Sequence, residues 1–220
     1  MSSAPVAIVF GARNVGRAVA HERRRAGWQV VAAARSDETL AALSDADPAI
    51  VTRSGDARSQ EFVDGVFESA ADLGEIGLVV NAITAPPRDQ SFGGGPISEA
   101  PPDRLASWMD GFVPMAWAIQ RRGARSLGAS GTGTLIQVAG GSARRGLPVR
   151  GPWGAAQRAG SALTHSLAPE TRHRGDHLAL LIADGNIETE RRPLGHDRPE
   201  EILHPDDVAA AVAYLSGQGN

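Results

Sequence analysis

The stretch Val6–Ala18 reads VAIVFGARNVGRA and predicts a buried strand, a glycine turn and the start of a helix. Its first five residues are apolar, which is typical of a strand covered on both faces. Gly11 and Gly16 then bracket a short turn that leads into a helical pattern. Such a turn points backbone N–H groups and a helix N-terminus at one place, where a phosphate can bind. We therefore expect a phosphate-binding turn at the beginning of an α/β fold.

The alternation of strand-length and helix-length segments continues along the chain. Further strands are expected at Gln29–Ala34, Ile50–Arg53, Leu78–Asn81, Thr134–Val138 and Leu178–Ile182. Helices are expected at Gly16–Arg25, Asp37–Leu43, Ser59–Leu73, Arg104–Leu127, Pro152–Thr171 and from Pro205 to about Leu215. This order predicts a Rossmann-type α/β fold, a doubly wound parallel sheet of about six strands with helices on both faces. The length fits one domain over residues 1–220.

Composition excludes several kinds of chemistry. All 22 basic residues are arginines, and cysteine is absent, so lysine Schiff-base and thiolate catalysis are excluded. The net charge is −3, and the longest basic run, Arg23–Arg25, is expected on an exposed helix face, so nucleic-acid binding is not expected. No apolar run reaches the length of a membrane span, and the histidines form no ligand cluster. We expect a cytoplasmic protein without a metal site.

A second informative stretch, Ile136–Pro169, reads IQVAGGSARRGLPVRGPWGAAQRAGSALTHSLAP. It resembles the active-site half of the short-chain dehydrogenase/reductase family. In that family a strand ends in a catalytic Ser, and a helix some thirteen residues later carries Tyr-x-x-x-Lys. The Ser position falls on Gly140, the Tyr on Trp153 and the Lys on Gln157, while the family's Asn on the preceding helix aligns with Gly111. The spacing is kept, but all four family side chains are replaced.

The same resemblance covers residues 5–216 in order and implies a dinucleotide site. An NAD-type site has a carboxylate at the end of the second strand, where this chain has Ala34 followed by Arg35. Because Arg35 can pair with a 2′-phosphate, assisted by Arg13, we expect NADP as the cofactor. The expected cofactor-binding residues are Gly11, Arg13, Asn14, Val15, Gly16, Arg35, Ser36, Asp56, Ala57, Asn81, Ala82, Gln157, Gly185 and Thr189.

Four other polar residues are candidate replacements for the family's catalytic side chains. Ser142, Arg144, Asp184 and Glu188 are expected on loops at the carboxyl ends of strands, each without a visible partner. Asp184 stands where the family has Pro and would face an anionic cofactor. The three glycines Gly93–Gly95 are expected to form a flexible lid or loop tip within the long surface loop 85–102.

Three functions stay open. The favoured one is an NADP(H)-binding protein without redox activity, acting as a sensor, scaffold or partner subunit. The second is an NADPH-dependent oxidoreductase with a non-standard proton donor, and the third is a non-redox cyclase or isomerase; a small-molecule ligand fits each. The resemblance also implies a homodimer through the two long helices. The family's seventh strand is not expected in this sequence, so the interface that normally uses it should be absent. Small residues on these helices are Ala106, Gly111, Ala116, Ala155, Ala156, Ala159, Gly160 and Ala162.

Overall fold

The computed structural model describes residues 4–84, 86–87, 92–127, 133–187 and 202–218. Its centre is a six-stranded sheet with the order β3-β2-β1-β4-β5-β6, in which every neighbouring pair is parallel. The strands are β1 (Val6–Phe10), β2 (Gln29–Ala34), β3 (Ile50–Ser54), β4 (Ile76–Asn81), β5 (Thr134–Gly140) and β6 (His177–Ala183). The predicted fold is therefore confirmed, and the chain order reverses between β1 and β4.

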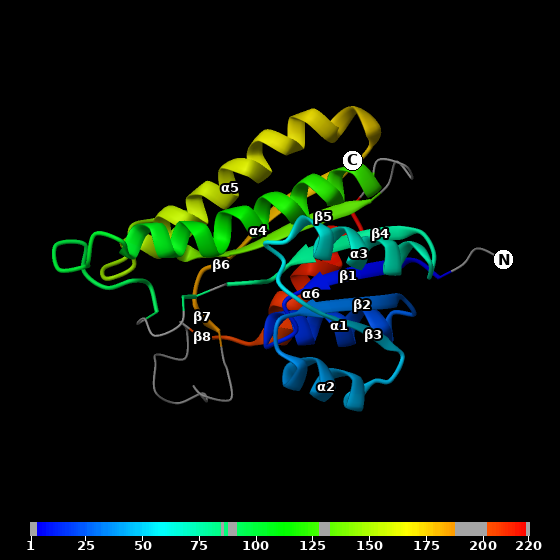
Figure 1. The fold of residues 1–220 in the computed structure, drawn as a ribbon. Helices are drawn as coiled ribbons and strands as arrows, with labels where there is room; N and C mark the ends of the chain where they lie inside the picture. The colour runs from blue at the N-terminus through cyan, green and yellow to red at the C-terminus, as the bar shows by residue number, and fades with distance from the viewer. Residues whose placement is uncertain (1–3, 85, 88–91, 128–132, 188–201, 219–220) are drawn as a thin grey trace.

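Helices cover both faces of this sheet (Figure 1). They are α1 (Val15–Arg25), α2 (Asp37–Ala46), α3 (Gln60–Ala71), α4 (Arg104–Leu127), α5 (Gly151–Thr171) and α6 (Pro205–Ser216). One hydrophobic core joins the sheet to α3, α4 and α5, and a second joins it to α1, α2 and α6. Within the described ranges, none of the helices combines the length and the apolar character that a membrane crossing requires.

Most predicted boundaries of strands and helices agree with the structure to within three residues. The strands follow the apolar runs of the sequence, and capping residues mark the beginning of several helices. The hydroxyls of Ser36 and Ser59 accept hydrogen bonds from Thr39 N and Phe62 N, which caps α2 and α3. The sequence did not predict two 3₁₀ helices, Gly141–Ala143 and Arg172–Arg174, or a short second sheet in which β7 (Asn186–Ile187) pairs in parallel with β8 (Ile202–Leu203). Two-residue strands carry no periodic signal in the sequence.

Helices α4 and α5 lie side by side along the sheet (Figure 1) and use several small residues for their own packing. A Cβ atom on Gly160 would lie 2.5 Å from the ring of Phe112. Ala116 and Ala156 are also completely buried within the subunit. These three small residues are therefore occupied by packing within the subunit, and the homodimer stays a prediction for the exposed part of the two helices.

Candidate functional site

A cavity of about 1490 Å³ lies at the carboxyl ends of the strands, where the chain order reverses. Ligands of open α/β sheets bind at this position, because the connections diverge there to opposite faces. The ends of β1, β2, β5 and β6 contribute Phe10, Ala34, Gly140 and Ala183 to its wall. The cavity continues toward α4 and α5, so it has one end beside β2 and another beside α5.

The glycine turn between β1 and α1 has the tight geometry that the sequence predicts. Gly11 has φ 97°, and a Cβ there would lie 3.1 Å from the backbone of Ala82. A Cβ on Gly16 would lie only 1.4 Å from the carbonyl oxygen of Gly11, so α1 begins directly against the turn. Asn14 adopts φ 42° and ψ −107°, a conformation that residues other than glycine rarely adopt. The N-terminus of α1 is thus exposed to the cavity at Arg13, Asn14 and Val15.

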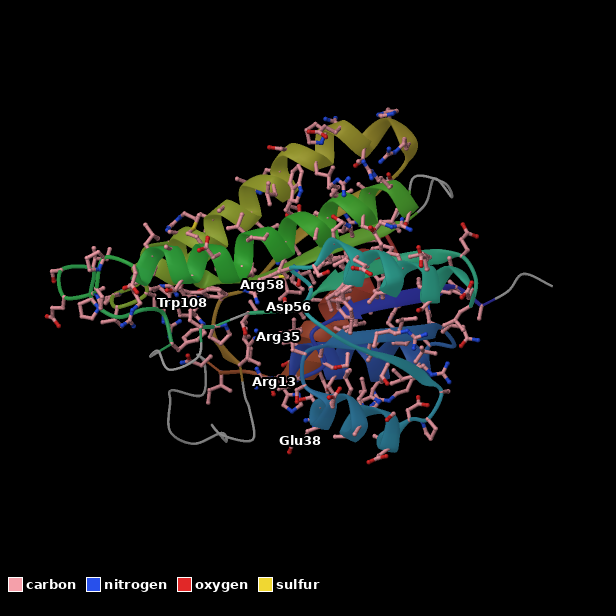
Figure 2. All side chains as sticks on the ribbon, in the orientation of Figure 1. Arg13, Arg35, Glu38, Asp56, Arg58 and Trp108 are labelled. Atoms are coloured by element: carbon pink, nitrogen blue, oxygen red, sulfur yellow. The ribbon has the colours of Figure 1, made fainter. Side chains whose placement is uncertain are left out.

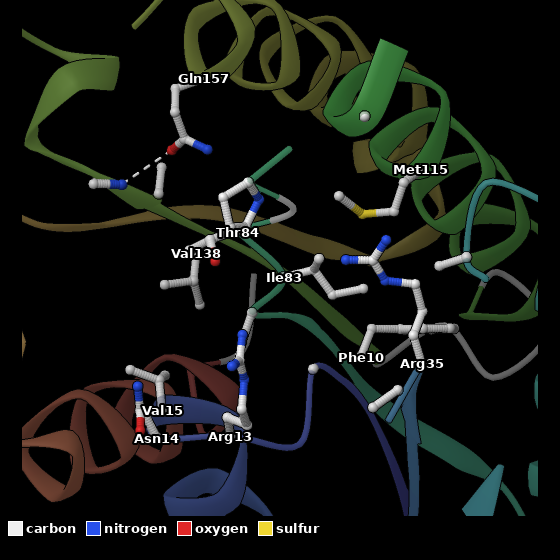
Figure 3. Close-up of a pocket in the computed structure, with 18 of the residues that line it drawn as sticks. Phe10, Arg13, Asn14, Val15, Arg35, Ile83, Thr84, Met115, Val138 and Gln157 are labelled. Atoms are coloured by element: carbon white, nitrogen blue, oxygen red, sulfur yellow. Dashed lines mark hydrogen bonds between the residues drawn. The ribbon is translucent and has the colours of Figure 1, made fainter. Parts of the chain in front are cut away.

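Three arginines line the end of the cavity beside β2. Arg13 extends from the glycine turn and Arg35 from the end of β2, and both reach into the cavity (Figure 3). Neither guanidinium group has a hydrogen bond or ion pair with another described residue. Arg58 follows β3 and pairs with Asp56, with 2.6 Å between Nη2 and Oδ2. This pairing lowers the pKa of Asp56 below its ordinary value, with a smaller contribution from the charge of Arg35.

Eleven of the fourteen predicted cofactor-binding residues line this cavity. They are Gly11, Arg13, Asn14, Val15, Arg35, Ser36, Asp56, Ala57, Ala82, Gln157 and Gly185. Gly16 supports the turn from behind, and Thr189 lies outside the described residues. Asn81 is completely buried: its Nδ2 donates to Gln137 Oε1 at 2.9 Å, and its Oδ1 accepts from Ile83 N at 3.2 Å. Asn81 therefore fixes the backbone that follows β4, and its own side chain does not line the cavity.

The end of the cavity beside α5 brings together the four residues that the resemblance aligned with the family's catalytic positions. Gly111, Gly140, Trp153 and Gln157 all line it. Gln157 is buried, and its Oε1 accepts a hydrogen bond from Gly140 N at 3.0 Å (Figure 3). Its amide nitrogen has no hydrogen-bond partner within the described part of the chain and remains available to a ligand.

Trp153 belongs to a cluster of four aromatic side chains. Its ring centroid lies 5.2 Å from that of Trp108 and 5.6 Å from those of Phe92 and Phe112. These separations are typical of tilted and edge-to-face ring packing. Trp153 is 3 % exposed, so the cluster fills the space around the family's Tyr position. Phe92 and Trp108 are far from Trp153 in the sequence, and no local pattern links them.

The loop before α5 is also held by an ion pair that the sequence did not indicate. Arg145 Nη2 lies 2.9 Å from Asp184 Oδ1, and Arg144 lies 3.9 Å from Oδ2. The hydrogen bond from Arg145 is the main reason why the pKa of Asp184 lies below its ordinary value. The expectation that Arg144 and Asp184 lack partners is therefore wrong, because two loops that follow different strands meet here. The positive charges also offset the Asp184 charge that a bound anion would otherwise meet.

The three-glycine segment packs against the beginning of α5. Gly93, Gly94 and Gly95 have φ of 97°, 95° and 85°, and Gly93 and Gly94 are buried. Gly95 N donates to Val149 O at 3.0 Å, and Trp153 N donates to Gly93 O at 3.3 Å. The expectation of a loop tip is therefore wrong: a Cβ on Gly93 or Gly94 would collide with Arg150 or Pro152.

Comparison with known proteins places this arrangement in a family. A family model described as enoyl-(acyl carrier protein) reductase matches residues 9–219. None of the curated proteins matches the chain in sequence.

Among the described residues, no group of three or more His, Asp or Glu side chains could hold a metal ion.

Solved structures with the same fold are numerous. An actinorhodin polyketide ketoreductase variant with NADPH has a TM-score of 0.81 and 21 % identity, covering 99 % of this chain and 92 % of its own. A short-chain dehydrogenase from Streptomyces avermitilis has a TM-score of 0.80 and 22 % identity, covering 98 % and 85 %. ElxO with NADP bound has a TM-score of 0.83 and 18 % identity, covering 98 % and 92 %. The family model spans nearly the whole described fold, and the chain belongs to the short-chain dehydrogenase/reductase family.

Proposed function

We propose that this protein binds NADP(H) and does not catalyse the family's usual carbonyl reduction. The observation that carries the first part is that Arg13 and Arg35 both line the cavity and extend into it (Figure 3). No acidic side chain among the described residues is within ion-pair distance of either guanidinium. Ala34 removes the carboxylate that an NAD-type site places at the end of β2. Two of the similar structures contain NADPH or NADP, which supports the same assignment.

The residues present fit a dinucleotide along the whole cavity. Gly11 leaves room for a pyrophosphate, and the N-terminus of α1 stabilises its charge. Arg13 and Arg35 provide charge-assisted hydrogen bonds for a 2′-phosphate. The amide nitrogen of Gln157 can donate to ribose hydroxyls at the other end. NADPH supplies a hydride to an electrophile when one is bound beside it.

The second part of the proposal concerns the proton that must accompany a hydride. In the family that this chain resembles, a Tyr donates this proton, a Lys lowers the pKa of the Tyr, and a Ser fixes the substrate oxygen. Trp153 has no acidic group at neutral pH, and Gly140 has no side chain. The Gln157 oxygen is already hydrogen-bonded to Gly140 N. Positioned proton transfer contributes on the order of 10²–10⁴ in rate, so turnover of generic ketones should be undetectable.

Affinity measurements test the cofactor assignment. NADPH should bind at least about tenfold more tightly than NADH, because a hydrogen bond to a charged group contributes roughly 1.5–3 kcal/mol. Arg35→Ala should remove most of this preference, while Arg25→Ala, an exposed arginine at the end of α1, serves as the matched control. Equal affinities, or no binding of either dinucleotide, would reject the assignment.

Restoring the family residues tests the absence of redox activity. Gly140→Ser, Trp153→Tyr and Gln157→Lys together rebuild a substrate anchor, a donor and its pKa modifier. The triple variant should oxidise NADPH with a generic aldehyde, whereas each single variant should not, because these groups act as a unit. Robust NADPH oxidation by the unmodified protein would contradict the proposal and favour a reductase with another proton donor.

A further inference from the structure

Arg150 is a cation at the end of the cavity beside α5. It immediately precedes α5 and lines the cavity, with its guanidinium carbon 5.5 Å from the ring centroid of Phe92. Throughout the described ranges, no carboxylate is within 4.0 Å of its guanidinium. This cation–π contact leaves N–H donors of the guanidinium for a ligand. Arg35 follows β2, whereas Arg150 precedes α5 and comes after β5, on the other half of the sheet. Arg150 is therefore a separate positive site.

Ser142 provides a second polar group at the same helix start. It is 2 % exposed and lines the cavity, and its Oγ has no hydrogen-bond partner among the described residues. Its Cβ lies 3.9 Å from the position that a Cβ on Gly154 would take, which places Ser142 against the first turn of α5. A buried hydroxyl without a partner costs free energy, and a bound acceptor would remove that cost.

The backbone around Arg150 is held in a strained conformation. Val149 has φ 58°, which is a rare conformation for a β-branched residue. It is fixed by the hydrogen bond from Gly95 N to Val149 O and by close contact with the buried Gly93. Strain of this kind persists only where the surrounding structure overdetermines it, as at ligand sites. The glycine segment therefore fixes the position from which Arg150 extends.

We propose that this end of the cavity binds a small planar organic carboxylate, with Arg150 pairing to the carboxylate and Ser142 donating to one of the same oxygens. A planar guanidinium matches a carboxylate in a two-point pairing. One cation, a neutral hydroxyl and the N-terminus of the 21-residue helix α5 suit a monoanion better than a phosphate dianion. Phe92, which is 51 % exposed, lines the same end and provides a flat apolar surface for the rest of the ligand. This inference rests on the proposed function in that the carboxylate would lie beside bound NADP(H).

Calorimetric titration with 2-naphthoate, in the presence of saturating NADP⁺, tests this site. The neutral analogue 2-naphthamide measures how much of the binding depends on the negative charge. We expect 2-naphthoate to bind at least about tenfold more tightly than 2-naphthamide. Arg150→Ala and Arg150→Gln should each remove that difference, and Ser142→Ala should weaken both probes a few-fold. Arg172→Ala is the matched control, because this exposed arginine at the far end of α5 does not line the cavity.

The outcomes separate this site from the dinucleotide site. NADPH affinity should be unchanged in both Arg150 variants, which also shows that they are folded. If NADPH binds normally but 2-naphthoate does not bind, or binds equally in the Arg150 variants, the carboxylate site is rejected and the cofactor assignment stands. If 2-naphthoate is displaced by NADP⁺ and lost in Arg35→Ala, it occupies the arginines beside β2, and the proposal is likewise rejected. If neither dinucleotide binds but 2-naphthoate still binds through Arg150, only the cofactor assignment fails.

Discussion

The two ends of the cavity differ in what fills them. Beside β2, the glycine turn and the guanidinium groups of Arg13 and Arg35 leave space and positive charge for a ligand. Beside α5, the Trp153 ring packs against Trp108 and Phe112, and buried aromatic side chains form much of the wall. One cavity thus has an end lined by charged groups and an end lined by aromatic groups. Because a fold does not by itself determine the chemistry of its sites, the two ends call for separate tests.

The largest expected change in the free energy of unfolding comes from removing an aromatic ring at the end of the cavity beside α5. Trp153→Ala should lower the free energy of unfolding by roughly 3–5 kcal/mol, the usual cost of deleting a buried tryptophan side chain. Tyr214→Ala, on the exposed surface of α6, should change it by less than about 0.5 kcal/mol. Urea unfolding measures both. A negligible effect of Trp153→Ala would show that this end is a loosely filled site, and the contrast between the two ends would disappear.

We expect a homodimer to form through the exposed face of α4 and α5. Trp117 on α4 is 55 % exposed, and Ala106, Ala155, Ala159 and Ala162 lie near the surface of the same helix pair. If this face forms a homodimer, Trp117→Arg should weaken the dimer by at least about 2 kcal/mol, as for other interface tryptophans. Light scattering over a dilution series measures the change, with Tyr214→Arg as the control. A monomer at micromolar concentration in the unmodified protein would remove this prediction.

A pair of glycines compares the backbone of the two ends. Gly16→Ala places a Cβ 1.4 Å from the Gly11 carbonyl oxygen, so α1 must move and about 1–3 kcal/mol of stability should be lost. Gly140→Ala meets nothing within 4 Å and should be close to neutral. Urea unfolding and NADPH titration of both variants provide the check. Equal losses would mean that the turn is no more constrained than the end of β5.

The sequence predicted the sheet because strand-length apolar runs and capped helices are local signals. The glycine turn was also predictable, since Gly11 and Gly16 have a fixed place between a strand and a helix. What the sequence did not reveal depends on contacts between distant segments: Phe92 on Trp153, and Arg145 on Asp184. Arg58 had a usable signal, because it follows Asp56 by two residues and can reach its carboxylate.

The smallest expected effect concerns the two ion pairs, one at each end of the cavity. Hydrogen bonds from Arg58 and Arg145 hold the pKa values of Asp56 and Asp184 below the ordinary aspartate value. Each pair therefore contributes stability above about pH 4, where an unfolded aspartate is ionised, and loses it as the pH falls through the lower folded pKa. The side chains of Asp56 and Asp184 are 36 % and 27 % exposed, so each contribution should be below about 1 kcal/mol.

Asp56→Asn and Asp184→Asn test this pH dependence separately. Each variant should be less stable than the unmodified protein at pH 7, and the difference should shrink toward zero in acid. Asp45→Asn, an exposed substitution on α2, is the control. Because Asp184 joins two loops and Asp56 pairs within one loop, the effect of Asp184→Asn should be the larger. A difference that grows as the pH falls would have the wrong sign for an ion pair and would contradict the assignment of both partners.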